Sequence, residues 1–356
     1  MHKDDQMTPK ERMTAFKAGQ AVDRIPIMPF MGTISARIAG MNLREMRSGP
    51  KTEAESQLAG YRRLGHDCLI SDYGLHGIGI ALGTRVNDPE HGVIAIQEYV
   101  LDDLNKIDRL DPEKVKRKND PKLARHYAAA EIMLKEAGDE CGLNVNLTGP
   151  FTAAASIYPT DKLLRALVKD PENVHRLLRF CTDCLKTVCR EYIDLGVGFT
   201  ICDPIASGTM MKKQNYLDFV YPYTRELVED LHSLGAGVGY HICGNTTKII
   251  EPMVDTGVDM LSLDNAVDME LAKETVGGRI CIVGNVDPTG VMMLGNAEDI
   301  DAAVKTCFRK AADSPCGFIL ATGCDVPYDA PLENLDSFMA SGRKYGRWPL
   351  DQSLYI

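Results

Sequence analysis

Short apolar runs alternate with longer amphipathic segments along most of this chain. Eight of the runs consist almost entirely of apolar and small residues, and turn residues such as Gly, Pro, Asn and Asp follow most of them. Such runs are typical of parallel strands that are covered by helices on both faces. We therefore predict strands at residues 25–30, 68–72, 143–148, 198–203, 237–242, 259–264, 279–285 and 317–322.

The segments between these runs carry helical periodicity. Eight strand–helix units in 356 residues predict an α/β fold, a (β/α)8 TIM barrel that forms a single domain over residues 1–356. Thr8, Pro9 and Glu11 form a capping pattern, which predicts a helical extension at the N-terminus. Residues 84–99 predict a hairpin insertion after the second strand. The rival fold, an open doubly wound sheet, should show a glycine-rich phosphate turn after its first strand, and none is present there.

The polar residues of chemical interest gather at one kind of position, the C-terminal end of a predicted strand. In barrels of this type the catalytic site is built at that end. This regularity supports the barrel and points to a functional site at its mouth. The residues concerned are Asp72, Asp203, His241, Cys243, Asp264, Asn285, Asp287 and Cys324.

A metal site is the most specific chemistry that these residues predict. His241 and Cys243 end the fifth strand in GVGYHICG, and side chains two apart on a strand share a face. Cys324 ends the run GFILATGC. One imidazole and two thiolates suit tetrahedral zinc with one open position. Asp264, after the sixth strand, is the candidate fourth ligand, and its alternative role is to cap the helix that follows.

Five further side chains have both a chemical and a structural interpretation. Asp72 and Asp203 are candidate catalytic residues, able to act as acids or bases or to orient a substrate. Their structural alternatives are a helix cap for Asp72 and an Asp-Pro turn for Asp203. His76, Asn285 and Asp287 are candidate substrate-binding residues, against simple packing for His76 and turn formation for the other two.

Composition restricts the class of protein. The net charge of −10 disfavours nucleic-acid binding, and no apolar run is long enough to span a membrane. The polar N-terminal sequence is unlike a secretory signal, so we expect a cytoplasmic protein whose eleven cysteines are reduced. Cys181 and Cys184 share one face of a helical pattern, which favours core packing over a redox pair.

Several segments resemble the uroporphyrinogen decarboxylase superfamily, and more narrowly its zinc-dependent, corrinoid-linked methyltransferases. These segments are MTPKERMTAFKAG, DRIPIMPF, HICGN, VGNVDP and GCDVPYDAPLEN. The resemblance runs nearly from end to end. It implies that His241, Cys243 and Cys324 are zinc ligands, and it places Asp264 where methyltransferase relatives have an acidic ligand candidate.

The resemblance also implies an activity. A methyl group would move between the cobalt of a corrinoid and a small substrate. That substrate is a methoxylated aromatic or other methyl donor, as in bacterial O-demethylases, or a thiol acceptor such as coenzyme M. Gly239 stands where a corrinoid lower-ligand motif around His241 would need aspartate, so we expect the corrinoid on a partner protein.

A metal-free lyase like uroporphyrinogen decarboxylase is the alternative. Asp72 resembles the essential aspartate of that enzyme in position. The segment FMGTISARIAGMN, however, corresponds to the arginine-rich motif of the decarboxylase and keeps only Arg37. One cation is a poor match for a substrate with many carboxylates.

Overall fold

The computed structural model describes residues 2–356, and their contacts group into two compact units. The first unit runs up to Ile70 and includes Ala129–Asn144 and Met260–Ile356; the second consists of Ser71–Ala128 and Val145–Asp259. The assignment of residues 1–356 to one domain stays a prediction.

Seven of the eight predicted strands form, each within two residues of its predicted bounds. They belong to one sheet in the order β1-β4-β5-β6-β7-β8-β9. The pairs β5–β6, β7–β8 and β8–β9 are parallel, which confirms the predicted fold class, an α/β barrel with helices between the strands. The strands are β1 (Leu69–Asp72), β4 (Leu143–Thr148), β5 (Gly198–Cys202), β6 (Val238–Ile242), β7 (Met260–Leu263), β8 (Cys281–Val286) and β9 (Phe318–Thr322).

The predicted strand at 25–30 is reduced to bridges. Ile27 pairs in parallel with Leu320 of β9, and the Met28 N–H donates to the Leu320 carbonyl at 2.8 Å. On its other side, the Ile27 carbonyl accepts from the Asp67 N–H at 2.9 Å, just before β1. Proline has no N–H to donate to a ladder, so Pro26 and Pro29 prevent a longer strand. The prediction gave the correct position for this segment beside β9, but it was wrong about the length of the strand.

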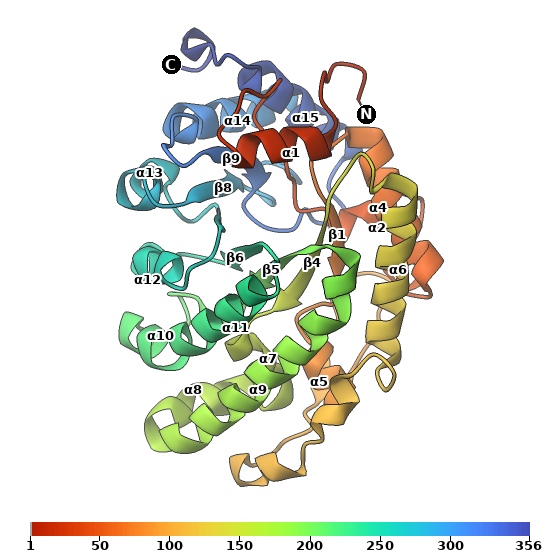
Figure 1. The fold of residues 1–356 in the computed structure, drawn as a ribbon, viewed down its shortest axis with the longest axis vertical. Helices are drawn as coiled ribbons and strands as arrows, with labels where there is room; N and C mark the ends of the chain where they lie inside the picture. Colours follow the sequence, from red (N-terminus) through yellow and green to blue (C-terminus); the bar gives the residue numbers. More distant parts are fainter. Residues whose placement is uncertain (1) are drawn as a thin grey trace. The chain divides into compact units, whose positions relative to one another are not determined.

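In the first unit some helices pack on strands and others on neighbouring helices, such as α2 on α4. The capping box that Thr8 and Glu11 predict is present at the start of α1, and α14 packs against β8, β9 and α15 (Figure 1). These helices are α1 (Pro9–Lys17), α2 (Ile34–Ile38), α3 (Leu43–Met46), α4 (Pro50–Leu64), α13 (Met269–Val276), α14 (Ala297–Ala311) and α15 (Leu332–Gly346). Helix α6 (Pro121–Ala137) contributes residues to both units.

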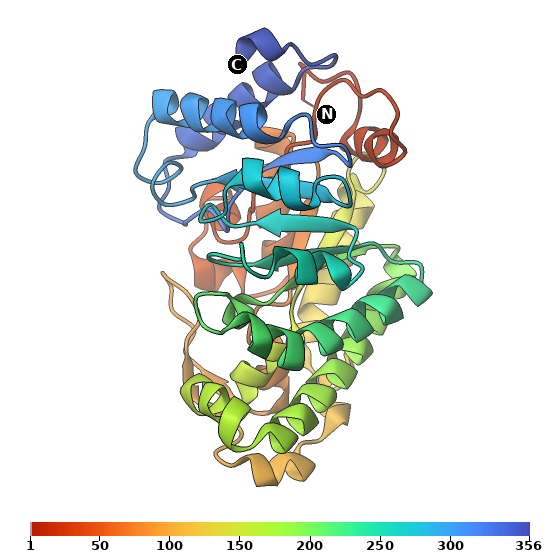
Figure 2. The ribbon, with the colours of Figure 1, turned by 90° about the vertical axis from the view of Figure 1, so that its left-hand side faces the viewer.

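In the second unit the long helix α9 lies beside α7, α8 and α11 (Figures 1 and 2). The predicted hairpin insertion is present, because β2 (Arg85–Val86) pairs antiparallel with β3 (Ile96–Glu98). Cys181 and Cys184 are free thiols buried on the inner face of α9, as predicted. The helices are α5 (Gly77–Leu82), α7 (Pro150–Ile157), α8 (Thr160–Lys169), α9 (Pro171–Tyr192), α10 (Lys213–Phe219), α11 (Tyr221–Ser233) and α12 (Ile250–Asp255).

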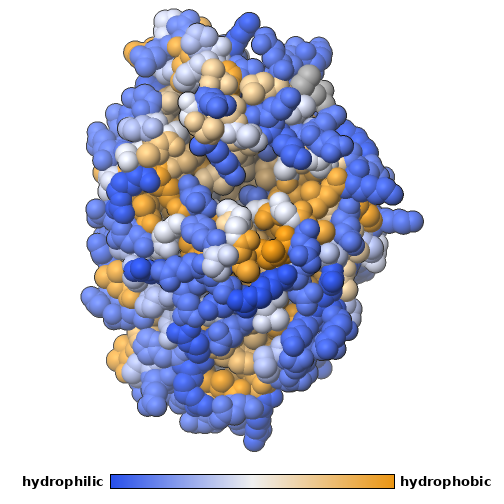
Figure 3. All heavy atoms as spheres, viewed as in Figure 1, coloured by the Kyte–Doolittle hydropathy of each residue, from blue (hydrophilic) through white to orange (hydrophobic). Residues whose placement is uncertain are grey.

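Most of the molecular face drawn in Figure 3 is hydrophilic, with hydrophobic residues in separate patches. Among residues 2–356, no helix combines the length and the apolar character that crossing a membrane requires.

Candidate metal centre

The end of β6 carries two of the predicted ligands. All five residues of this strand are buried, and His241 is only 3% exposed. Its register sets His241 beside Cys202 of β5. Cys243 is half-buried just beyond the strand, and its Sγ lies 3.3 Å from His241 Nε2. The two side chains therefore project together, as the spacing of two along a strand predicts.

Cys324 lies two residues beyond β9, on a loop with several backbone restraints. The Thr322 hydroxyl donates to the Cys324 carbonyl at 2.8 Å and accepts from the Phe30 N–H at 3.1 Å. The Gly323 N–H donates to the Val286 carbonyl at 2.8 Å. A Cβ at Gly323 would lie 2.5 Å from the Asn265 nitrogen. The loop therefore needs glycine at position 323 to take this path.

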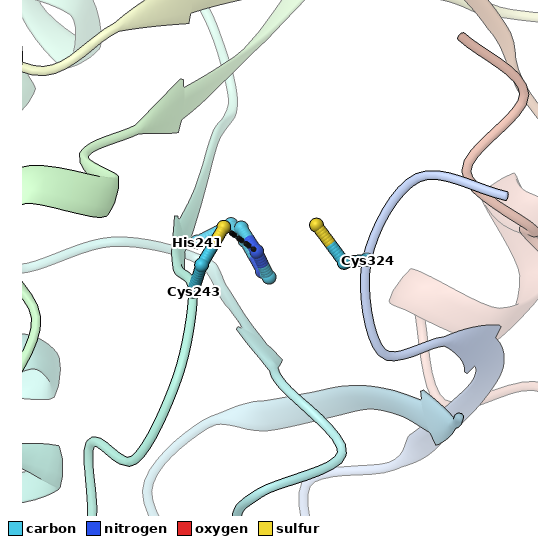
Figure 4. Close-up of side chains that lie close together, drawn as sticks. All are labelled: His241, Cys243 and Cys324. Atoms are coloured by element: carbon cyan, nitrogen blue, oxygen red, sulfur yellow. Dashed lines mark hydrogen bonds between the residues drawn. The ribbon is translucent and has the colours of Figure 1, made fainter. Parts of the chain in front are cut away.

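The structure brings His241, Cys243 and Cys324 together. One ligand atom from each, a ring nitrogen or a Sγ, lies within 4.8 Å of the others, and Figure 4 shows the two sulfur atoms and the imidazole converging. Zinc bonds of about 2.3 Å to sulfur and 2.0–2.1 Å to nitrogen would separate tetrahedral ligands by roughly 3.5–3.8 Å. The donor set and its spacing therefore fit zinc after small side-chain adjustments.

Asp264 is not part of this group of donors. Its Oδ1 accepts from the Ala266 N–H at 2.8 Å, and its carbonyl accepts from Asn285 Nδ2 at 3.0 Å. The Asp264 side chain therefore holds the turn after β7, while Asp268 caps the helix that follows, α13. A role for Asp264 as the fourth ligand stays a prediction.

The two candidate catalytic aspartates differ in environment. Asp72 is exposed, and its Oδ1 accepts from the Gly74 N–H at 2.8 Å. Asp203 is fully buried and accepts from the Thr152 N–H at 2.7 Å and the Thr152 hydroxyl at 2.5 Å. Burial raises the pKa of Asp203 to about 6, against the opposing effect of the hydrogen bonds from Thr152. Asp203 therefore fixes the first turn of α7, and a catalytic role for either aspartate stays a prediction.

The candidate substrate-binding residues also have structural contacts. The Asn285 amide donates to the Val267 carbonyl at 2.7 Å as well as to Asp264. Asp287 Oδ1 accepts from the N–H groups of Thr289 and Gly290, each at 2.8 Å. Both residues therefore shape the loops after β7 and β8.

His76 is half-buried at the start of α5, and its Nδ1 is buried without a hydrogen-bond partner. Burial lowers the pKa of His76, and the nearby charge of Lys122 lowers it further. A neutral imidazole with a free nitrogen can accept or donate one hydrogen bond to a ligand. Substrate binding by His76 stays a prediction.

Sequence analysis missed the residues that hold the two ligand-bearing loops. Asp325 accepts hydrogen bonds from Gly32 and Thr33, and burial raises the pKa of Asp325 to about 7. Behind Cys243, Gly244 adopts φ +80°, and a Cβ there would lie 2.9 Å from Ser207 Oγ. A polar residue directly after Cys324 was the one available signal for Asp325.

Comparison with known proteins identifies the family. Residues 8–345 match the uroporphyrinogen decarboxylase (URO-D) family. The chain belongs to this family. Methylcobamide:CoM methyltransferase MtbA of Methanosarcina mazei is 30% identical over 348 residues, covering 95% of this chain and 98% of the relative. A uroporphyrinogen decarboxylase of Trichodesmium erythraeum is 29% identical over 221 residues, covering 60% of this chain and 61% of the relative.

A solved structure supports the fold. A methyltransferase from Methanosarcina mazei superposes with a TM-score of 0.82 at 21% identity, covering 96% of this chain and 99% of that one. The M. mazei MtbA and a methylated-thiol--coenzyme M methyltransferase of the same organism cover 95% and 94% of this chain, while the T. erythraeum decarboxylase covers 60% of it. The predicted resemblance is therefore confirmed, and with it the prediction of an enzyme of the methyltransferase class.

Proposed function

We propose that this URO-D family member is a zinc-dependent methyltransferase that moves a methyl group between a small substrate and the cobalt of a corrinoid on a partner protein. The observation that carries the proposal is the convergence of His241, Cys243 and Cys324. The similarity to methylcobamide:CoM methyltransferases over 95% of the chain supports it.

The three side chains would hold the ion and leave one position open. A zinc ion bound there would act as a Lewis acid that lowers the pKa of a substrate thiol or polarises a leaving oxygen. The thiolates of Cys243 and Cys324 balance the charge of a divalent ion, and His241 adds a neutral nitrogen. This set therefore leaves room for one anionic substrate atom.

The substrate belongs to one of two classes. It is a thiol acceptor such as coenzyme M, which is named in the relatives, or a methoxylated aromatic or other methyl donor. In the first case the substrate thiol would lose its proton and its sulfur would take the methyl group, whose bond to cobalt would break with the electron pair left on the metal. In the second, the bond between oxygen and the methyl group would break as the methyl group goes to cobalt, and the departing oxygen would gain a proton. Asp72, at the end of β1, is the candidate donor of that proton.

The corrinoid is assigned to a partner protein. Sequence analysis overlooked one match to the lower-ligand spacing Asp-x-His-x-x-Gly, at Asp230, His232 and Gly235. Asp230 forms an ion pair with Arg190 at 2.5 Å, and His232 Nε2 lies 3.1 Å from Asp259 Oδ2. Both side chains thus serve contacts within the fold, and the match does not change the assignment. The proposed location of the enzyme is the cytoplasm.

The metal-free lyase is the weaker alternative. The similarity to a decarboxylase over 60% of the chain is its support. Arg37, the one arginine in the segment that corresponds to the substrate-binding motif, donates to the carbonyls of Ala330 at 2.9 Å and Tyr328 at 3.3 Å. Its guanidinium therefore fixes a loop of the fold.

Metal content and cobalamin absorbance test the proposal together. Purified protein should contain about one zinc per chain, and Cys243→Ala and Cys324→Ala should lose most of it because each removes one of three donors. Cys316→Ala, which changes an exposed free thiol, is the control. With zinc present, a suitable thiol should demethylate free methylcobalamin, or a suitable methoxylated aromatic should methylate free cob(I)alamin, and either change is visible in the absorption spectrum. Porphyrinogen decarboxylation by zinc-free protein would favour the lyase.

A further inference from the structure

Asp325 is the residue next to Cys324, and its side chain ties the loop after β9 to the segment before α2. Oδ1 accepts from the Gly32 N–H at 2.7 Å. Oδ2 accepts from the Thr33 N–H at 3.2 Å and from the Thr33 hydroxyl at 2.9 Å. One carboxyl group thus satisfies three donors of a segment that lies 292 or 293 positions earlier in the chain.

No cation balances this carboxyl group. Among the ion pairs of residues 2–356, none involves Asp325, whereas Asp5 and Asp67 of the same unit both contact arginine side chains. A half-buried carboxyl group without a cation gains its stabilisation from hydrogen bonds alone. The hydrogen bonds to Gly32 and Thr33 are therefore the interactions that hold the Asp325 carboxyl group in place.

The Asp325 carboxyl group packs closely against the backbone of Gly32. A Cβ built at Gly32 would lie 2.6 Å from Asp325 Oδ1 and 3.0 Å from its Cγ. Glycine at position 32 therefore allows the carboxyl group to approach the backbone closely, and any larger residue would push it away.

Two further restraints act on the same stretch. The Thr322 hydroxyl bridges the Phe30 N–H, at 3.1 Å, to the Cys324 carbonyl, at 2.8 Å. The Val326 N–H donates to the Phe30 carbonyl at 3.1 Å. Cys324 is thus flanked on both sides by bonds to residues 30–33, and the bonds of Asp325 are the nearest on its C-terminal side.

We infer that Asp325 is a positioning residue that fixes the Cys324 thiol for the metal by binding its loop to Gly32 and Thr33. The inference rests on the zinc site of the proposed function. Partners that orient metal ligands typically contribute a factor of about 10–100 to metal affinity. Asp325 acts on the backbone of the ligand residue rather than on its sulfur, and its contribution should lie in the same range.

The test measures zinc affinity by competition with a chromogenic chelator at about pH 8. Asp325→Asn turns an acceptor into an NH2 group that faces the donors of residues 32 and 33, so zinc should bind about 10–100-fold more weakly. Asp329→Asn makes the same change at an exposed position of the same loop and should leave zinc affinity unchanged.

A second variant keeps the charge of Asp325. Gly32→Ala displaces the carboxyl group by steric contact and should weaken zinc binding in the same direction. With cobalt(II) in place of zinc, both variants should also weaken the sulfur-to-metal charge-transfer absorption, which a general loss of stability would not do in folded protein.

The outcomes separate two failures. If the wild-type protein binds no zinc, the proposed function fails. If the wild-type protein binds zinc and both Asp325→Asn and Gly32→Ala bind it equally well, Asp325 has no positioning role. A lower melting temperature with unchanged zinc affinity and unchanged cobalt spectrum would likewise overturn the inference and leave Asp325 as a structural residue.

Discussion

Two groups of polar side chains in this molecule differ in whether they find their binding partners within the protein. The arginine cluster, Asp5, Arg12, Asp23, Arg24 and Asp67, pairs each carboxylate with a guanidinium: Arg12 lies 2.5 Å from Asp67 and 2.6 Å from Asp23, and Arg24 lies 2.9 Å from Asp5. The donor group, His241, Cys243 and Cys324, brings together three metal-binding atoms. Arg343, 3.2 Å from Asp5, supplies the third cation for the three carboxylates of the first group, whereas the second group has the composition of a ligand set.

Burial alone therefore does not mark a functional site. Arg12 is completely buried and His241 almost so, yet Arg12 meets the groups that it needs within the fold. The donor group is distinguished by the kind of atom that converges. An imidazole nitrogen and two sulfur atoms bind a soft or borderline metal ion more strongly than they bind one another.

The largest expected effect on stability comes from opening the arginine cluster. Arg12→Met removes the guanidinium that Asp23 contacts and one of the two that Asp67 contacts, so the free energy of unfolding should fall by about 3–5 kcal/mol. Arg62→Met breaks a well-exposed pair with Glu136 and should cost about 0–1 kcal/mol. Chemical denaturation measures both changes.

The zinc content of Arg12→Met tests whether the arginine cluster and the donor group are independent. The folded fraction of Arg12→Met should keep the zinc stoichiometry of the wild-type protein, because the cluster is complete without a metal. Equal stability of the two variants, or loss of zinc from folded Arg12→Met, would remove the distinction between the two groups.

The next effect is a pH dependence from His66, which adjoins the arginine cluster. Both of its ring nitrogens are buried without a hydrogen-bond partner. Burial lowers the pKa of His66 to about 4; the charge of Asp67 opposes this shift, and the charges of Arg343 and Arg24 add to it. The unfolded chain, with an ordinary pKa near 6.5, takes up the proton first as the pH falls.

Stability should therefore decrease between about pH 6.5 and pH 4, by roughly 3 kcal/mol from this residue. Denaturation curves of His66→Leu across this range should be flatter than those of the wild-type protein by that amount. His91→Leu, at an exposed position, should retain the wild-type slope. A His66→Leu profile that parallels the wild-type profile would mean that His66 is not the neutral buried group described here.

A smaller effect is expected where glycine shapes the loop of Cys243. Gly244 has φ +80°, and a Cβ would lie 2.9 Å from Ser207 Oγ and 3.0 Å from Thr209 Oγ1. Gly244→Ala should cost about 1–3 kcal/mol and weaken zinc binding about tenfold, because it moves the neighbour of a ligand.

Gly235→Ala provides the matched control. Its φ is +79°, but a Cβ there meets nothing within 4 Å. It should show the cost of the backbone conformation and no change in zinc affinity. Equal zinc affinities of Gly244→Ala and Gly235→Ala would mean that Gly244 does not help to position Cys243 for zinc.

The smallest expected effect concerns Asp264. Asparagine can accept the same hydrogen bond from the Ala266 N–H, so Asp264→Asn should change stability by about 0.5 kcal/mol or less and zinc affinity by less than about twofold. Titration with the chelator measures it. A loss of tenfold or more would show that Asp264 is the fourth ligand and extend the donor group to four residues.

The sequence was sufficient for seven of the eight strands and for the meeting of the three donors, because both depend on local order. Runs of apolar residues define β4, β6 and β9 almost to the residue, and the ends of β6 and β9 lead directly to Cys243 and Cys324. Parallel strands in one barrel end at the same rim, so donors far apart in sequence could be expected to meet there.

What could not be predicted depends on contacts between distant segments. Nothing near Gly32 indicates that its amide meets a carboxyl group 293 positions later. Asp203 has the form of a rim acid, but the donors that occupy it come from Thr152, 51 positions earlier. Such partners appear only when the chain is folded, so the sequence could not show that Asp203 holds the first turn of α7.

X-ray absorption at the zinc edge tests the central claim most directly. The account predicts two sulfur atoms at about 2.3 Å and at least one imidazole nitrogen at about 2.0–2.1 Å in the wild-type protein, and one sulfur fewer in any metal retained by Cys324→Ala. A zinc shell of nitrogen and oxygen alone, or purified folded protein that takes up no zinc, would contradict it.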